Sequence, residues 1–173
     1  MEPDLERAAR ARATSEHYEA VKLMSAKAGN PTPDKPTLPS VELRKTCANL
    51  ILEEALEAID SLGFYVCHSP RDVIVDISAF KDGDIQVLPE VDSLVEEDLA
   101  NIAHECADLR VVASFAMAVS GISDESVQMA VDQANLAKFG PGGYKHPESG
   151  KWIKPPDHKK PDIAQIIHWQ KEG

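Results

Sequence analysis

Five acidic residues form two clusters whose spacing suits a metal site. Glu53, Glu54 and Glu57 lie in the run LILEEALEAI, and Glu105 and Asp108 lie in the run NIAHECADLRVV. Residues three or four positions apart share one face of a helix, so each cluster gathers its carboxylates on one face. Like charges in apolar surroundings repel each other and are costly to desolvate. A divalent cation bound between two such helices would offset this cost, and the pattern therefore predicts a metal site.

The neighbours of these acids along the chain are mostly apolar. The positions three and four residues away include Leu50, Ile51, Ala58, Ile102, Leu109, Val111 and Val112. We therefore expect no basic partner for the acids on their own helices. A single EExxE run is more often a solvated helical face, but two acidic clusters in apolar surroundings favour metal binding.

The acidic motifs supply only oxygen donors. Mg²⁺ prefers octahedral oxygen coordination, which water and substrate phosphates usually complete. Di-iron sites in helical bundles add a His three residues after a Glu, and neither Glu57 nor Glu105 is followed by one. The donors therefore favour Mg²⁺, with Mn²⁺ as the alternative, over iron or zinc. We interpret His104, which precedes Glu105, as a surface or packing residue rather than a ligand.

Hydrophobic periodicity and helix-end signals predict an all-α fold, a bundle of four to five helices. We expect helices over residues 14–28, 40–62, 95–120 and 123–139, and a short final helix that begins at Pro161. The runs VIVDISAF and DIQVLPEV, with Asp-Gly between them, predict a small β-hairpin insertion at about 72–91. Residues 1–13 are expected to be a flexible N-terminus, and residues 14–173 a single domain.

Composition and charge restrict the possible partners. The net charge of −11 argues against general nucleic-acid binding, which needs a basic surface. No apolar run approaches the ~20 residues that cross a membrane, and the N-terminal run MEPDLERAARAR lacks the apolar stretch of a secretory signal. No two cysteines make a CxxC pair, and we expect Cys47 and Cys106 to be buried thiols. These observations indicate a cytoplasmic protein without a membrane partner.

Four motifs in a fixed order resemble a known family. The EExxE run, the later ExxD run, Asn135-Leu136-Ala137-Lys138 and Gly150-Lys151-Trp152-Ile153-Lys154-Pro155-Pro156 resemble the MazG-like all-α nucleoside triphosphate pyrophosphohydrolases. That superfamily includes dimeric dUTPases and phosphoribosyl-ATP pyrophosphohydrolases. The likeness covers most of residues 14–167. One departure is the separation of 47 residues between the two acidic motifs, which is longer than the family usually has. The predicted hairpin accounts for the excess.

The resemblance implies a Mg²⁺-dependent hydrolase that cleaves a (deoxy)nucleoside triphosphate to the monophosphate and pyrophosphate. dUTP, dCTP and non-standard nucleotides all fit this expectation. The implied metal ligands are Glu53, Glu54, Glu57, Glu105 and Asp108. Of these, Glu53 and Glu57 would be catalytic, and Glu53 would either hold a further ion or act as base on the attacking water. The implied substrate-binding residues are Asn135, Lys138, Lys151 and Lys154.

Other interpretations stay open. Lys138 would also suit the C-terminal end of a helix, and Lys151 and Lys154 would also fit as loop charges. Trp152 and Trp169 are expected to pack rather than to stack on a base. The alternative substrate is phosphoribosyl-ATP, and the alternatives to an enzyme are a non-catalytic nucleotide- or metal-binding bundle and a structural interaction protein. The Ala- and Val-rich third helix presents more apolar surface than one small chain covers, which predicts a homodimer or homotetramer.

Overall fold

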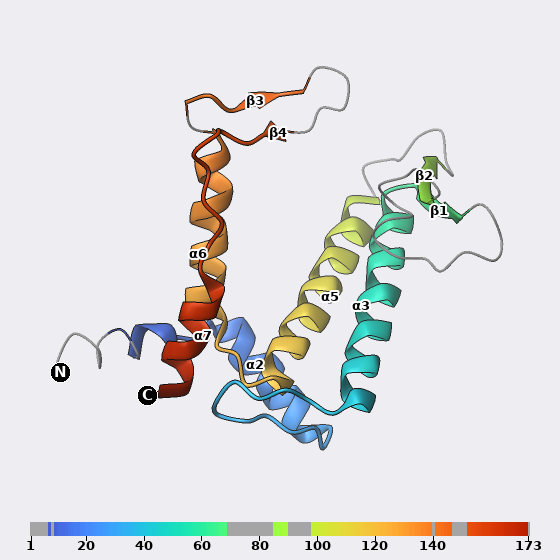
Figure 1. Cartoon of the computed structure of the whole chain (residues 1–173). Coiled ribbons are helices and arrows are strands. Elements are labelled where there is room, and N and C mark those ends of the chain that lie inside the picture. Colours follow the sequence, from blue (N-terminus) through green and yellow to red (C-terminus); the bar gives the residue numbers. More distant parts are fainter. Residues whose placement is uncertain are drawn as a thin grey trace. The chain divides into compact units, whose positions relative to one another are not determined.

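A computed structural model describes residues 7, 9–68, 85–89, 98–139, 141–146 and 152–172 (Figure 1). The chain is mostly helical, which confirms the all-α fold class. It forms two compact units, one from residues 40–113 and one from the flanking residues on both sides. The boundaries expected from the sequence, with a flexible segment at 1–13 and one domain over 14–173, stay a prediction.

The unit of residues 40–113 contains the helices that carry the acidic motifs. Its elements are α3 (Val41–Ser61), β1 (Phe64–His68), β2 (Ile85–Pro89) and most of α5 (Asp98–Val119). Ser40 caps α3, because its hydroxyl accepts a hydrogen bond from the backbone N–H of Leu43 at 3.2 Å. The helix buries Cys47, Ala58 and Ser61. Glu54 lies seven residues after Cys47 and four before Ala58, so helical periodicity places it on the same face.

The two strands of this unit pair as an antiparallel ladder, with Phe64 opposite Pro89 and His68 opposite Ile85. The second strand agrees with the expected hairpin. β2 pairs with β1, which begins at Phe64, before the expected start of the hairpin at about residue 72. The aromatic and β-branched residues of the run FYV favour an extended strand and account for this difference. Residues 69–84, which include the expected first strand and its Asp-Gly turn, lie outside the described residues.

The other unit gathers the remaining elements. They are α2 (Glu16–Lys27), α6 (Asp124–Leu136), η1 (Ala137–Phe139), β3 (Tyr144–Lys145), β4 (Trp152–Ile153) and α7 (Ile163–Glu172). Tyr18 and Val21 of α2 are buried, as are Ala118 and Val119 from the last turn of α5. These side chains form the centre of the unit. The helices expected over 14–28, 40–62 and 123–139 and from Pro161 agree with the described elements to within a few residues.

A buried glutamine connects three segments of this unit. The Gln170 side chain on α7 is 1% exposed. Its Nε2 donates to the carbonyl oxygens of Ala11 at 2.8 Å and Ser123 at 3.0 Å. Its Oε1 accepts from the N–H of Ser123 at 3.1 Å. Asp124 adds a second link, because its carboxylate accepts hydrogen bonds from the N–H and hydroxyl of Ser15. These bonds hold the starts of α2 and α6 and the end of α7 together.

The proline-rich stretch of residues 30–40 forms neither helix nor strand. It is held at the C-terminal end of α5, where the N–H of Thr37 donates to the carbonyl of Ser120 at 2.8 Å. The next residue, Gly121, has a φ of +64°, and an added Cβ would lie 2.3 Å from the carbonyl oxygen of Lys35. Only glycine fits this close approach.

The described residues also test the expectations for the cysteines and for membrane-spanning helices. Cys47 is buried, as expected, but Cys106 is exposed, so the expectation of two buried thiols was wrong for Cys106. Cys106 directly follows Glu105, and helical geometry turns it away from the face that Glu105 and Asp108 share. None of the helices in the described ranges combines the length and the apolar composition that a membrane span requires.

Candidate metal centre

The two acidic motifs meet where α3 and α5 lie side by side (Figure 1). One carboxylate oxygen from each of Glu54, Glu57 and Glu105 lies within 4.8 Å of the others. The first two residues come from α3 and the third from α5. Residues separated by about a quarter of the chain therefore offer oxygen donors to one small volume.

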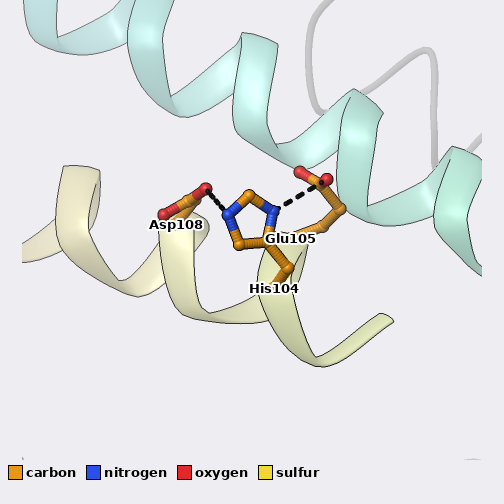
Figure 2. Close-up of side chains that lie close together, drawn as sticks. All are labelled: His104, Glu105 and Asp108. Atoms are coloured by element: carbon orange, nitrogen blue, oxygen red, sulfur yellow. Dashed lines mark hydrogen bonds and ion pairs between the residues drawn. The ribbon is translucent and has the colours of Figure 1, made fainter. Parts of the chain in front are cut away.

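A second group of donors shares Glu105. His104, Glu105 and Asp108 offer one ligand atom each, and these atoms also lie within 4.8 Å of one another. The imidazole of His104 lies between the two carboxylates (Figure 2). Its Nδ1 is 3.3 Å from Oε1 of Glu105, and its Nε2 is 3.4 Å from Oδ2 of Asp108. The two groups together form one continuous set of four carboxylates and one imidazole.

The electrostatics of this set show its charge imbalance. The pKa of Glu54 is raised because the carboxyl is partly withdrawn from water and because Glu57, Asp108 and Glu105 lie close by. Glu54 is half-buried, whereas Glu57 is exposed. The negative charges of the four carboxylates thus act on one another across the two helices. A cation at this place would favour the ionised forms that repulsion now disfavours.

His104 is the basic partner that the motif analysis overlooked. We expected no basic residue on the acids' own helices, and this is wrong for Asp108, because His104 precedes it by four residues. The pKa of His104 is raised, mainly by its hydrogen bond to Glu105 and then by the charges of Asp108, Glu105 and Glu54. The H-x-x-x-D spacing was readable in the sequence. It was missed because only Lys and Arg were considered as partners.

Glu53 is not part of either donor group within the described residues. It lies on α3 directly before Glu54, and its side chain is exposed. Helical geometry turns successive residues by about 100°, so Glu53 and Glu54 point in different directions. The role of Glu53 as ligand or base stays a prediction.

The residues expected to bind substrate lie outside the unit that carries the donor groups. Asn135 and Lys138, at the end of α6 and in η1, are joined by a hydrogen bond from Nζ of Lys138 to Oδ1 of Asn135. Lys154 is exposed. Lys151 lies outside the described residues. Their roles stay predictions.

Trp169 lies elsewhere in the same flanking unit, at an apolar cavity of about 220 Å³. Ala11, Met129 and Ile166 line this cavity together with it. This position is consistent with a packing role for the indole. The side chain of Trp152 lies outside what the structure describes.

The donors around Glu105 fit a hard divalent cation. Carboxylate oxygens are the ligands that Mg²⁺ and Mn²⁺ prefer. Among the described residues, no lysine or arginine forms an ion pair with these carboxylates. Partial burial and then the charges of Glu57, Asp108 and Glu105 raise the pKa of Glu54. Glu54, Glu57, Glu105 and Asp108 are the residues that would hold the ion.

Comparison with known families identifies the chain. The family model described as phosphoribosyl-ATP pyrophosphohydrolase matches residues 21–135, well over half of the sequence. The match includes both acidic motifs and ends before Lys138. No curated protein matches the chain. The family agrees with the resemblance to the MazG-like enzymes that the motif order indicated. The chain therefore belongs to the phosphoribosyl-ATP pyrophosphohydrolase family and is a nucleotide pyrophosphohydrolase, a hydrolase that acts on a phosphoanhydride bond.

Proposed function

We propose that this protein is a Mg²⁺-dependent pyrophosphohydrolase of nucleoside triphosphates, which it converts to the monophosphate and pyrophosphate. The observation that carries the proposal is the convergence of oxygen donors from Glu54, Glu57 and Glu105 within 4.8 Å of one another. A triphosphate brings several negative charges, and an acidic centre accepts it only with cations between the two. This donor set therefore supports an acidic centre that needs cations to bind its substrate.

The chain's own residues divide the chemical work. Mg²⁺ held there would neutralise phosphate charge and favour attack of water on the α-phosphorus. Glu54, Glu57, Glu105 and Asp108 would hold the cation. Glu53, whose carboxylate faces solvent on the preceding helical position, would take the proton of the attacking water. A bond then forms between the water oxygen and the α-phosphorus, the bond to the bridging oxygen breaks, and pyrophosphate leaves with that oxygen.

We propose that Asn135, Lys138, Lys151 and Lys154 recognise the phosphates and the sugar, as the motif order implies. Asn135 and Lys138 lie one turn apart and are already joined by a hydrogen bond, so they would act as a pair on phosphate or sugar oxygens. Lys151 and Lys154 would add positive charge over the phosphates. Lysines outnumber acids from Lys138 onward in a chain that is otherwise strongly acidic, which supports this assignment.

The second candidate substrate is phosphoribosyl-ATP, and the observation that favours it is the family match itself. Both candidates are cleaved at the same type of bond, between the α- and β-phosphates. Two features distinguish this chain from the family's usual pattern and favour the nucleoside triphosphate. They are the long separation of the acidic motifs and the paired strands β1 and β2 between them. dUTP, dCTP and non-standard nucleotides in the cytoplasm are the proposed substrates.

A substrate panel tests this proposal. Pyrophosphate release would be measured for ribo- and deoxynucleoside triphosphates and for phosphoribosyl-ATP, with Mg²⁺, with Mn²⁺ and with a chelator. We expect metal-dependent release from at least one triphosphate and none with the chelator. Release from phosphoribosyl-ATP alone would replace the first substrate by the second. No release from any compound by folded protein would contradict the proposal and favour a non-catalytic binder.

We also propose that the protein works as a homodimer or homotetramer. Val41, Leu52 and Leu56 on α3 are 65%, 60% and 43% exposed in the single chain. Their spacing of 11 and four residues places them on one face of the helix. A second copy of the chain would cover this face. Light scattering should give a multiple of the 18.9 kDa chain mass, and Leu52→Glu with Leu56→Glu should shift the mass towards the monomer. A monomeric wild-type protein would contradict the proposal.

A further inference from the structure

Three helical segments border the apolar cavity of about 220 Å³ in the unit that flanks residues 40–113. Met129 and Gln133 come from α6, Ile166 and Trp169 come from α7, and Ala11 comes from an N-terminal helical segment, residues 7 and 9–11. α6 and α7 lie side by side (Figure 1). The lining residues of each helix are three or four positions apart, so each helix turns one face to the cavity.

The burial of the lining residues changes from the floor of the cavity to its rim. Ala11 and Ile166 are 3% and 9% exposed and form the floor, whereas Met129 is 58% exposed and lies at the rim. The carbonyl oxygen of Ala11 accepts hydrogen bonds from Nε2 of Gln170 at 2.8 Å and from Oγ of Ser126 at 2.9 Å. Because these polar atoms already bond to one another, the floor favours an apolar ligand group.

The charge at the rim is opposite in sign to that of the whole chain. Among the described residues that line the cavity, both charged ones are arginines, Arg7 and Arg10, and both are exposed. They already interact with other groups of the protein. A guanidinium has five N–H donors, however, and a carboxylate commonly uses two of them. In a chain with a net charge of −11, this local positive charge favours an anion at the rim.

The size and the side chains of the cavity restrict the ligand further. An apolar cavity of about 150 Å³ holds one benzene molecule, so a cavity of about 220 Å³ suits a body of one or two fused rings. Trp169 supplies an aromatic surface, and the thioether of Met129 makes favourable contacts with aromatic rings. Both side chains favour a flat ring system over an alkyl chain.

We propose that this cavity binds a small aromatic carboxylate, with its rings against Ile166 and Trp169 and its carboxylate at Arg7 and Arg10. The bound molecule would hold the N-terminal helical segment against α6 and α7. The inference goes beyond the proposed function and does not depend on it, because the cavity and the acidic donor groups belong to different units.

Calorimetric titration with 2-naphthoate and with its neutral amide, 2-naphthamide, tests the charge and the rings separately. We expect the wild type to bind 2-naphthoate with a Kd of about 100 µM or below, and at least about tenfold more tightly than the amide. Arg7→Gln with Arg10→Gln should weaken 2-naphthoate by at least about tenfold and the amide by less than about threefold. Arg44→Gln with Lys45→Gln, at exposed residues of α3, removes the same charge elsewhere and should bind as the wild type does.

Nuclear magnetic resonance of the indole N–H groups tests where the molecule binds. The chain has two tryptophans, and Trp169→Phe assigns their signals. The Trp169 signal should shift when 2-naphthoate is added. Ala130→Phe, at a half-buried lining residue, would place a ring inside the cavity and should abolish the shift. If this variant does not fold, the arginine pair and the amide decide the question.

Three results would overturn the inference. The first is a Kd for 2-naphthoate above about 1 mM or equal to that of the amide. The second is a Trp169 signal that does not change on binding. The third is a Trp169 signal that shifts with protein concentration alone, because a second copy of the chain would then occupy the cavity.

Discussion

Nε2 of His104 lies 3.4 Å from Oδ2 of Asp108, one helical turn further along α5. The other nitrogen of the same ring lies 3.3 Å from Glu105, so one imidazole joins both acids of the second motif. On α3, the pKa of Glu54 is raised by partial burial and then by the charges of Glu57, Asp108 and Glu105. The balance between four carboxylates and one imidazole therefore determines how the protein should respond to metal, to pH and to substitution.

Glu105 is the acid that both donor groups share, and its loss should be the most damaging at the centre. We expect Glu105→Gln to lower kcat/KM by roughly 10²-fold or more, since metal stabilisation of a phosphoryl transition state is worth several kcal/mol. Steady-state pyrophosphate release measures this. Asp60→Asn, an exposed acid of α3 outside both groups, is the control. Unchanged turnover in Glu105→Gln would remove Glu105 from the mechanism.

The raised pKa of Glu54 predicts a pH-dependent stability of the metal-free protein. Because the folded state holds the proton more tightly than the ordinary value of 4.5 implies, the stability that Glu54 contributes is complete below pH 4.5. This contribution is lost as the pH rises through the folded pKa. With a chelator present, Glu54→Gln should therefore melt at a higher temperature than the wild type at neutral pH. The difference should shrink towards pH 4.5.

Mg²⁺ should reverse this ranking, because it stabilises the wild type by mass action and the variant less. The test measures melting temperatures of the wild type and of Glu54→Gln, each with and without Mg²⁺, at several pH values. His104 makes a second pH-dependent contribution to stability. Because its pKa is also raised, this contribution is complete below the ordinary pKa of 6.5 and is lost as the pH rises through the folded pKa. The double variant with His104→Gln separates the two steps. A higher melting temperature for the metal-free wild type at neutral pH would contradict this account.

The buried side chain of Gln170 predicts a large stability effect far along the sequence from the acidic motifs. Gln170→Met keeps the length of the side chain but leaves the carbonyls of Ala11 and Ser123 without their donor. We expect it to lower the free energy of unfolding by roughly 1–3 kcal/mol. Urea denaturation measures this. Gln128→Met, at an exposed position of α6, should change stability by less than about 0.5 kcal/mol. Equal effects of the two substitutions would contradict the assignment.

Tyr18 should titrate at a higher pH than an ordinary tyrosine. Its pKa is raised to about 12, mainly by burial and then by the charges of Asp124 and Glu19. The stability that neutral Tyr18 contributes is complete below its ordinary value of 10.0 and is lost as the pH rises through about 12. Tyrosinate absorbance should therefore show a late step that coincides with alkaline unfolding, and Tyr18→Phe should lack it.

Local chemistry explains why the helices were predictable. Ser15 and Ser40 cap α2 and α3 through side-chain hydrogen bonds to residues three positions later. Apolar residues at helical spacing and glycines at the ends complete the signal, and all of these act over a few residues. The reaction class was also readable, because the motifs that carry it are short and stand in order. The family match bears this out.

Strand pairing and exposure were less predictable, because they depend on contacts between distant residues. The strand directly after α3 was not expected, since the run FYV carries no alternating pattern of its own and gains its strand from pairing with β2. Cys106 sits in an apolar run yet is exposed. The burial of an apolar helical face depends on which element packs against it. Hydrophobic periodicity alone does not predict that element.

At the candidate metal centre, spacing along the chain determined that Glu54 and Glu57 share one face of their helix. The same spacing rule places His104 and Asp108 on one face of theirs, because helical geometry is local. Only the placement of α5 beside α3 brought Glu105 within ligand distance of the first pair. That approach depends on the packing of two helices separated by a long connection, which no short-range rule specifies. The pKa of Glu54 is raised mainly by partial burial and by Glu57 on the same helix. The placement of α5 adds the charges of Asp108 and Glu105, because Coulomb repulsion depends on distance through space and not on separation in sequence.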